Sequence, residues 1–373
     1  MPPTDPVPFD QRTLRDPEVV SRLLEYVNKL AGDLSAERGR PIRLMEVCGT
    51  HTMNIGRFGF RSALADGLEL LSGPGCPVCV TASQDVDRAI ALAAVPGVTV
   101  ATFGDMVRVP GSTGSLATQR AAGADERVVY SPLDAVRLAE ELPDREVVLI
   151  GVGFETTAPA IAACALDAEA RGLANFSILG LNKTTDAALR AIADDPAMEI
   201  DGFILPGHVC CITGLDTFGF LPREHGVPGV ATGFEPVDIL RGIALLLEIV
   251  RSGEPRIANA YPRCVTPAGN EAALALMDAV FERRDAAWRG LGTLPESGLA
   301  LKGAYRRLDA LERFEVEVGD STEPRGCRCG DVLRGAIAPE TCPLFGRACT
   351  PSSPVGPCMV SSEGSCAAHY RYR

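Results

Sequence analysis

Short apolar runs alternate with amphipathic segments along most of the chain. In the first third, helical spacing covers 19–34 and 81–95, and four apolar runs indicate strands at 42–47, 68–71, 98–103 and 127–130. Strands that alternate with helices of this length are typical of βαβ units in a parallel sheet. The first third of the chain is therefore predicted to form one α/β domain.

The same alternation continues after residue 131. Strands are predicted at 146–152, 176–181, 202–205 and 228–231, and helices at 132–142, 158–171, 184–194 and 236–250. Pro159 falls in the first turn of its helix, where a missing backbone N–H is tolerated. This part of the chain predicts a second α/β domain.

Two pairs of loops suggest that the two domains are related. EVCGTHT at 46–52 is similar to GVGFETT at 151–157, and GPGCPVCVT at 73–81 is similar to PGHVCCIT at 206–213. Each loop follows a predicted strand, and ligands of open α/β sheets bind at the carboxyl ends of strands. A cleft between two such domains would bring the four loops together; chance similarity between glycine- and threonine-rich turns is the alternative.

The pattern changes near residue 258. Residues 270–289 are predicted to form one long helix, 299–311 has mixed character, and a segment rich in Pro, Gly and Ser begins at residue 326. The predicted division is a flexible arm (1–20), a first α/β domain (21–131), a second α/β domain (132–257) and a C-terminal helical, cysteine-rich domain (258–373).

Composition narrows the classes of function. The net charge is −12, without a Lys- or Arg-rich run, so a nucleic-acid phosphate backbone would be repelled and is not an expected partner. The N-terminus lacks a basic segment followed by an apolar one, and no run of 18 apolar residues exists, so neither a signal peptide nor a membrane partner is expected. We therefore expect a cytoplasmic protein, in which clustered cysteines more often bind metal or do redox chemistry than form structural disulfides.

Six of the 13 cysteines lie in the last 47 residues, in a segment with almost no periodic apolar pattern. Such a segment cannot fold on its own hydrophobic burial and needs a metal or disulfides. Cys327, Cys342, Cys349 and Cys366 are separated by 14, 6 and 16 residues, without the close pairs of a structural zinc site. Long loops that converge on one point favour an iron–sulfur cluster; zinc and buried, unreactive cysteines are the alternatives.

A second group of cysteines follows the first two strands. Cys76 and Cys79 form a C-x-x-C pair flanked by glycines, which can be a redox dithiol, a pair of metal ligands, or two buried cysteines at a turn. Cys48 and His51 are three residues apart, so both could bind iron, or His51 could activate Cys48 as a nucleophile. A small core cysteine is the alternative for Cys48.

Three further candidates follow strands. His208 lies at a strand end, as His51 does, rather than on an apolar helix face, where a structural histidine would be expected. Glu155 is a candidate catalytic group, although Thr156 beside it could simply cap the next helix, and Asp105 is similar to Glu155. Cys164 and Cys264 are interpreted as structural.

These residues stand in motifs that resemble the HypD family of hydrogenase maturation factors, from about residue 20 to the C-terminus. The motifs are EVCGTHT (46–52), GPGCPVC (73–79), GFETT (153–157), PGHV (206–209), CRCGDVLRG (327–335), CPLFG (342–346), CTP (349–351) and GPCMVSSEG (356–364).

The resemblance implies two related α/β domains and a C-terminal iron–sulfur domain with a [4Fe–4S] cluster on the four cysteines with 14-6-16 spacing. It also implies assembly of the Fe(CN)2CO group of [NiFe]-hydrogenases together with the small chaperone HypC. Cyanide would come from HypE, and the finished group would pass to the hydrogenase large subunit.

A role for each remaining cysteine follows from this resemblance. Soft, low-spin iron suits thiolate ligands, so Cys48, Cys76 and Cys79 are the expected iron ligands, and Gly49 is expected to leave space beside Cys48. Cys329 and Cys358 remain after the cluster ligands are assigned, and are expected to relay electrons between the cluster and the Cys76/Cys79 pair. Two rival hypotheses are a stand-alone iron–sulfur thiol–disulfide reductase and a zinc-stapled protein-binding module.

Overall fold

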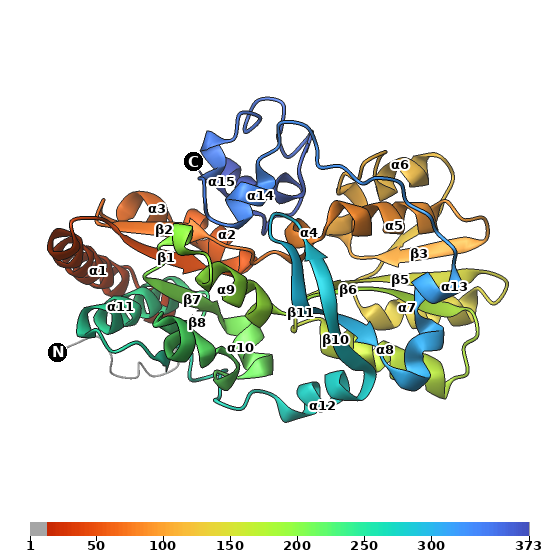
Figure 1. Ribbon diagram of the computed structural model, residues 1–373, viewed down its shortest axis with the longest axis horizontal. Helices are drawn as coiled ribbons and strands as arrows, with labels where there is room; N and C mark the ends of the chain where they lie inside the picture. Colours follow the sequence, from red (N-terminus) through yellow and green to blue (C-terminus); the bar gives the residue numbers. More distant parts are fainter. Residues whose placement is uncertain (1–12, 373) are drawn as a thin grey trace.

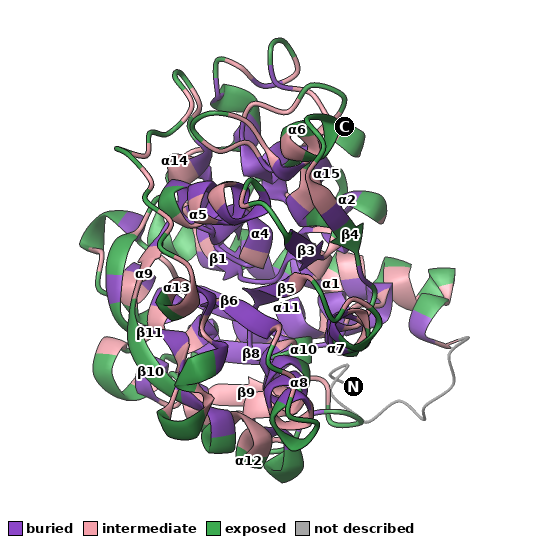
Figure 2. Ribbon diagram, turned by 90° about the vertical axis from the view of Figure 1, so that its right-hand side faces the viewer, coloured by how far each residue is buried: buried purple, intermediate pink, exposed green. Residues whose placement is uncertain are grey.

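The structure is a computed structural model that describes residues 13–372. Its βαβ units form two parallel sheets, which lie side by side along the long axis of the molecule (Figure 1). The strands of both sheets are largely buried, as expected for parallel sheets covered on both faces (Figure 2). The α/β class and the two parallel sheets predicted from the sequence are confirmed.

The first sheet has the strand order β2-β1-β7-β8-β9, and every neighbouring pair is parallel. Its strands are β1 (Ile42–Glu46), β2 (Leu68–Ser72), β7 (Gly202–Pro206), β8 (Gly229–Thr232) and β9 (Ile257–Asn259). Its helices are α1 (Pro17–Arg38), α2 (Gly49–Arg57), α3 (Phe60–Ala63), α10 (Gly207–Thr213) and α11 (Pro236–Ser252).

Helix α1 shows how local sequence sets these bounds. The Asp16 side chain accepts a hydrogen bond from the Glu18 N–H at 2.9 Å, Pro17 occupies the first turn, and Gly39 ends the helix with a φ of 69°. The helix packs its apolar stripe against α11 and one face of the sheet. Residues 1–12 of the predicted arm lie outside the described residues, whereas 13–15 form η1 and α1 begins at Pro17, so ordered structure begins before the predicted boundary at residue 20.

The second sheet has the strand order β4-β3-β5-β6, again all parallel. Its strands are β3 (Val98–Thr102), β4 (Asp125–Val128), β5 (Glu146–Gly153) and β6 (Phe176–Asn182). Its helices are α4 (Pro77–Val80), α5 (Ser83–Ala93), α6 (Leu116–Ala121), α7 (Pro132–Glu141) and α8 (Ala158–Ala170); α9 (Thr185–Ala193) lies on the connection from β6 back to the first sheet.

Strand pairing does not follow the predicted division at residue 131. Strands β3 and β4 join β5 and β6, although the division placed the two pairs in different domains. Strands β7 and β8 return to pair with β1, at the register Leu44↔Gly202. Periodicity identifies single strands but not their neighbours, which is why a sequential division was the expectation.

The segment predicted as one helix over 270–289 is divided. Helix α12 (Glu271–Val280) ends where β10 (Phe281–Trp288) begins, and β10 pairs antiparallel with β11 (Gly292–Leu301). Gly290 in the turn between them and Gly292 at the start of β11 both have positive φ, which a continuing helix would not accept. Tertiary pairing therefore overrides the local helical spacing, and the prediction of one long helix is wrong.

The cysteine-rich tail lies above the junction of the two sheets (Figure 1, blue). It holds only the short helices α14 (Cys329–Leu333) and α15 (Ser365–Arg371), after α13 (Ala310–Arg313) in the preceding segment. Its cysteines belong to the same apolar cluster as the inner faces of both sheets. The shorter turns are η1 (Thr13–Arg15), η2 (Gly104–Arg108), η3 (Pro196–Met198), η4 (Asp216–Phe218), η5 (Leu221–His225), η6 (Gly303–Leu308), η7 (Pro339–Thr341) and η8 (Pro357–Met359).

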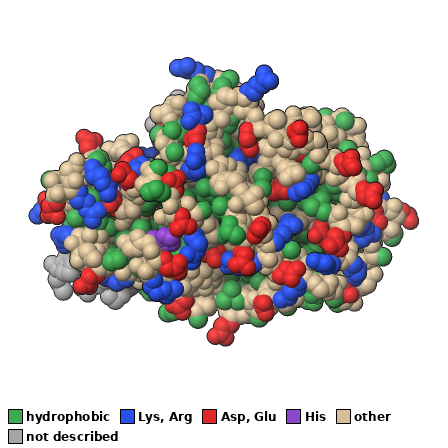
Figure 3. All heavy atoms as spheres, viewed as in Figure 1, with side chains coloured by type: hydrophobic (Ala, Val, Ile, Leu, Met, Phe, Trp, Pro, Cys, Tyr) green, Lys and Arg blue, Asp and Glu red, His purple; other side chains and the backbone are tan. Residues whose placement is uncertain are grey.

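Between residues 13 and 372, no helix is both long and apolar enough to cross a membrane. On the face shown in Figure 3, acidic and basic side chains are interspersed over both lobes.

Candidate functional site

The loop that carries Cys48 is packed directly against the loop that carries Cys76. Strands β1 and β2 are parallel neighbours, so both loops leave the same edge of the sheet. The Gly49 N–H donates to the Gly75 carbonyl at 3.1 Å, and a Cβ added to Gly75 would lie 2.2 Å from the Cys48 nitrogen. Only glycine at position 75 allows this approach.

Cys48 is the residue before helix α2, and it is 8% exposed. Burial raises the pKa of its thiol to about 12, against the effect of backbone N–H groups of His51 and Thr50. The donors near this sulfur are backbone groups and burial dominates, so the arrangement does not favour the alternative in which the His51 imidazole activates Cys48. With its pKa raised this far, Cys48 is a neutral thiol at neutral pH.

A buried carboxyl group lies beneath Cys48, and the sequence analysis missed it. Glu46 is fully buried, accepts from the Cys48 N–H at 3.3 Å and accepts from the Thr52 hydroxyl at 2.5 Å. Burial raises its pKa to about 7. The sequence signal that could have indicated this buried carboxyl group is the acidic residue inside the apolar run 42–47.

One aromatic ring joins the two histidines predicted at strand ends. Phe234 stacks on His51 and on His208, with ring centroids 4.6 Å and 3.8 Å away. The His51 Nε2–H donates to the Gly233 carbonyl at 2.9 Å, and burial lowers the pKa of His51 to about 4, so its ring is neutral. Its Nδ1 is buried without a partner among the described residues. The structure brings the two histidines together, but the His51 ring bonds to Gly233 rather than activating Cys48.

The C-x-x-C pair lies at the start of helix α4. The Cys79 N–H donates to the Cys76 sulfur at 3.3 Å, and the two residues are 0% and 4% exposed. Burial raises the pKa of the Cys79 thiol. The pair is thus buried beneath the tail.

The Cys79 thiol of α4 contacts cysteine thiols of the tail. The Cys79 side chain is hydrogen-bonded to Cys358, and its sulfur lies 3.9 Å from the Pro357 carbonyl, to which it donates. The sulfurs of Cys358 and Cys329 are 2.6 Å apart. The two cysteines predicted as a relay therefore contact each other and reach the Cys76/Cys79 pair.

The four predicted cluster ligands surround one pocket in the tail. Its lining is sulfur and apolar side chains: Cys327, Cys329, Cys342, Leu344, Phe345, Cys349, Gly356, Cys358, Met359 and Cys366. Among the described residues no three His, Cys, Asp or Glu side chains already stand in the geometry of a bound metal ion. The donor set nevertheless suits an iron–sulfur cluster, since it is all thiol, and the Val355 N–H donates to the Cys349 sulfur at 3.3 Å.

Glu155 occupies the corresponding edge of the second sheet. It is 3% exposed and accepts from the Thr185 N–H at 2.7 Å and the Thr185 hydroxyl at 2.8 Å. Burial, and then the Asp186 charge, raise its pKa to about 7. Thr156 does not cap helix α8, because the residue before that helix is Thr157, without a side-chain cap bond.

Cys210 connects the two sheet edges and was given no role from the sequence. It is fully buried, and its thiol interacts electrostatically with both Glu155 and Cys48. The stacking of His51 and His208 on Phe234 brings the Cys48 and PGHV loops together, and the Glu155 charge acts on the Cys210 thiol in helix α10.

The tail is also fastened to both lobes at this junction. Glu363 accepts from the Thr50 hydroxyl at 2.7 Å, and Ser361 donates to Asp105 at 2.7 Å. A Cβ on Gly49 would lie 2.4 Å from the Glu363 Cβ. Glu363 of the tail thus packs directly against Gly49, and the expectation that Gly49 leaves free space beside Cys48 is wrong. Glu363 lies inside a tail motif, but no sequence pattern indicates its partner Thr50.

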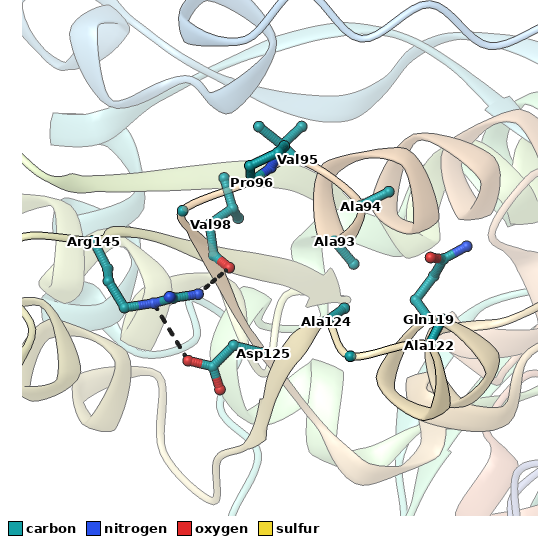
Figure 4. A pocket seen from close by; sticks show the side chains of 12 residues that line it. Ala93, Ala94, Val95, Pro96, Val98, Gln119, Ala122, Ala124, Asp125 and Arg145 are labelled. Carbon is teal, nitrogen blue, oxygen red and sulfur yellow. Dashed lines mark hydrogen bonds and ion pairs between the residues drawn. The ribbon is translucent and has the colours of Figure 1, made fainter.

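A more open pocket lies elsewhere, at the amino-terminal ends of β3 and β4 (Figure 4). Arg145 donates to the Val98 carbonyl at 2.8 Å and lies 3.5 Å from the Asp125 carboxylate, so its polar groups are already paired. This pocket contains none of the candidate residues.

Comparison with known proteins identifies the family of the chain. The HypD model, described as "Hydrogenase formation hypA family", matches residues 19–373. The chain belongs to the HypD family. The hydrogenase maturation factor HypD of Rhodobacter capsulatus is 45% identical over 363 residues, which cover 96% of each chain. HypD of Escherichia coli K12 is 42% identical over 96% of each chain, and HypD of Azotobacter vinelandii is 44% identical over 92% of this chain and 93% of its own. The HypD match includes every candidate residue described above.

Proposed function

We propose that this chain is a hydrogenase maturation factor that acts as a redox-active thiol scaffold for assembly of an Fe(CN)2CO group. One observation carries the proposal: a line of contacting thiols connects the Cys76/Cys79 pair to a cysteine-lined pocket in the tail of a HypD-family chain. A chain that only bound a protein partner would not need buried thiols in mutual contact.

In this proposal the iron with its diatomic ligands is the substrate, and Cys48 is its anchor. Cys48 is held rigidly between β1 and α2, with the Cys76 loop against its backbone. Thiolate is the ligand type that soft, low-spin iron prefers, and Cys76 and Cys79 are the further iron ligands. Burial keeps the three thiols away from water, which protects them until iron arrives.

Cys327, Cys342, Cys349 and Cys366 would hold a resident [4Fe–4S] cluster, since they line one apolar pocket. Such a cluster supplies one-electron transfer when it is bound. Cys329 and Cys358 lie in contact between this pocket and Cys79, where a dithiol can pass electrons on by thiol–disulfide exchange.

The partners in the proposal are the chaperone HypC, the cyanide donor HypE and, as the final acceptor, the hydrogenase large subunit. We place the work in the cytoplasm, because all 13 cysteines are free and a reducing compartment keeps them so. Glu155 and His208 face the same junction as Cys48 and are the candidate proton-handling groups.

The rival function is a stand-alone iron–sulfur thiol–disulfide reductase, which the Cys329–Cys358 contact also favours. Infrared spectra of the chain purified together with HypC separate the two. The scaffold predicts bands in the cyanide and CO stretching region, and their absence from an iron-loaded complex supports the reductase.

Cys48→Ala is the matched variant for this experiment. It should keep the fold and the bound iron and sulfide of the tail, but lose the infrared bands and hydrogenase maturation together. Wild-type maturation by this variant would move the anchor to Cys76 or Cys79.

A further inference from the structure

A buried arginine at the tip of the β10–β11 hairpin lies between the α4 thiols and the tail. The Arg289 side chain is 1% exposed. Its backbone N–H donates to the Val80 carbonyl at 2.9 Å, and its Nε donates to the Thr81 carbonyl at 3.1 Å. Arg289 therefore holds the end of the helix that carries Cys79.

The same hairpin tip touches the first cysteine turn of the tail. Gly290 has a φ of 80°, and a Cβ placed on it would lie 2.5 Å from the Gly330 Cα. Gly330 follows Cys329 directly, and Glu323, the ion partner of Arg289, lies four residues before Cys327 in the chain. A cation is thus fixed beside the start of the cysteine-rich tail.

The charge of Arg289 is incompletely balanced. Within residues 13–372 its one ion partner is Glu323, a surface carboxylate that is 53% exposed. Its Nη2 is buried and has no hydrogen-bond partner among the described residues. A buried guanidinium with an unused donor is destabilising unless an anion compensates it. Thiolates that hold a cluster would supply that anion.

We propose that Arg289 raises the reduction potential of the cluster held by the tail cysteines, by stabilising its reduced state. The inference rests on the proposed function. Reduction adds one electron to the cluster and makes it more negative, so a fixed nearby cation favours that state. Arg289 acts by position and charge, and it ligates nothing.

The test is a potentiometric titration of the iron- and sulfide-loaded chain, with dithionite as reductant and absorbance or electron paramagnetic resonance as readout. Arg289→Gln should disfavour the reduced state at least tenfold, which is a shift of about 59 mV to lower potential for one electron. Arg289→Lys keeps the charge and should shift it less.

Glu323→Gln is the variant that does not disturb the core, because Glu323 is half-exposed. Removing this counter-charge should move the potential in the opposite direction, to higher values. Lys183→Gln is the matched control for loss of a buried cation. The Lys183 Nζ lies 5.7 Å from the centre of the Trp288 ring in the same hairpin. Its charged neighbours are Asp85 and Arg284. This substitution should leave the potential unchanged.

Two results together overturn the inference and leave the proposed function intact. At full iron content, the wild type, Arg289→Lys and Glu323→Gln have equal reduction potentials, and the potential of Arg289→Gln is unchanged or higher. A wild-type chain that binds no iron and sulfide overturns both. If Arg289→Gln alone loses its iron, the potential of Glu323→Gln decides the inference, and it must be higher than that of the wild type.

Discussion

Gly75→Ala is the sharpest single test of the junction between the Cys48 and Cys76 loops. The added methyl carbon would stand 2.2 Å from the Cys48 nitrogen and 2.4 Å from the Val47 carbonyl carbon. Ordinary van der Waals contact begins at 3.4 Å, so the two loops must separate by about 1 Å. The obstructing atoms are backbone, and no side-chain rotation relieves the contact.

The expected loss follows from two effects. Overpacking of a well-packed interior costs about 1–3 kcal/mol. Separation of the loops also weakens the Gly49 N–H to Gly75 carbonyl bond, which contributes about 1 kcal/mol net. We therefore expect Gly75→Ala to lower the free energy of unfolding by about 3 kcal/mol.

The assay is equilibrium urea unfolding followed by far-ultraviolet circular dichroism, with all thiols reduced. Gly32→Ala is the matched control, because Gly32 is exposed within α1 and an added Cβ meets no atom within 4 Å. That substitution should stabilise the chain by about 0.5–1 kcal/mol through helix propensity. A Gly75→Ala free energy within about 0.5 kcal/mol of the wild type would refute the close packing of the two loops.

The remaining predictions concern the thiols and one buried acid. Cys342→Ser should remove the bound iron and sulfide, whereas Cys264→Ser, at an exposed turn, should keep both, as measured by elemental and sulfide analysis. Cys358→Ser should keep the iron and sulfide, but the oxidation state of the Cys76/Cys79 thiols should no longer change with that of the tail. Alkylation and mass spectrometry measure this, and a pair whose oxidation state still changes with the tail would exclude the relay. Because the pKa of Glu155 is raised from 4.5 to about 7, its contribution to stability is complete below pH 4.5 and is lost as the pH rises through 7. Between those pH values, Glu155→Gln should gain about 3 kcal/mol of unfolding free energy relative to the wild type. Parallel pH profiles of the two proteins in urea unfolding would contradict this.

The fold was predictable where each element carries its own signal. Apolar runs at 42–47 and 146–152 correspond to β1 and β5, because a strand buried on both faces is apolar throughout. The helix predicted over 270–289 failed for the opposite reason. The pairing of β10 with β11 and the positive φ of Gly290 are properties of the hairpin, which local spacing does not record.

The site was predictable as a set of residues but not as a geometry. Motifs at strand ends pointed to Cys48 and Glu155, since parallel strands deliver their carboxyl ends to one edge. The partners that set their chemistry come from distant segments. Phe234 lies between the two histidines, and Glu363 reaches Thr50 from the tail, and neither contact leaves a pattern in the sequence.

The crossing of the chain between the two sheets explains why the tail matters to the site. The chain leaves the first sheet after β2 and enters the second through α4, so Cys79 lies on a connection between the lobes. The tail joins the same lobes through Glu363 to Thr50 and Ser361 to Asp105, each at 2.7 Å. Any shift of one lobe against the other must therefore strain both the connection and the tail. A cluster on the tail cysteines, as proposed above, would therefore also help to hold Cys48 in place relative to Cys79.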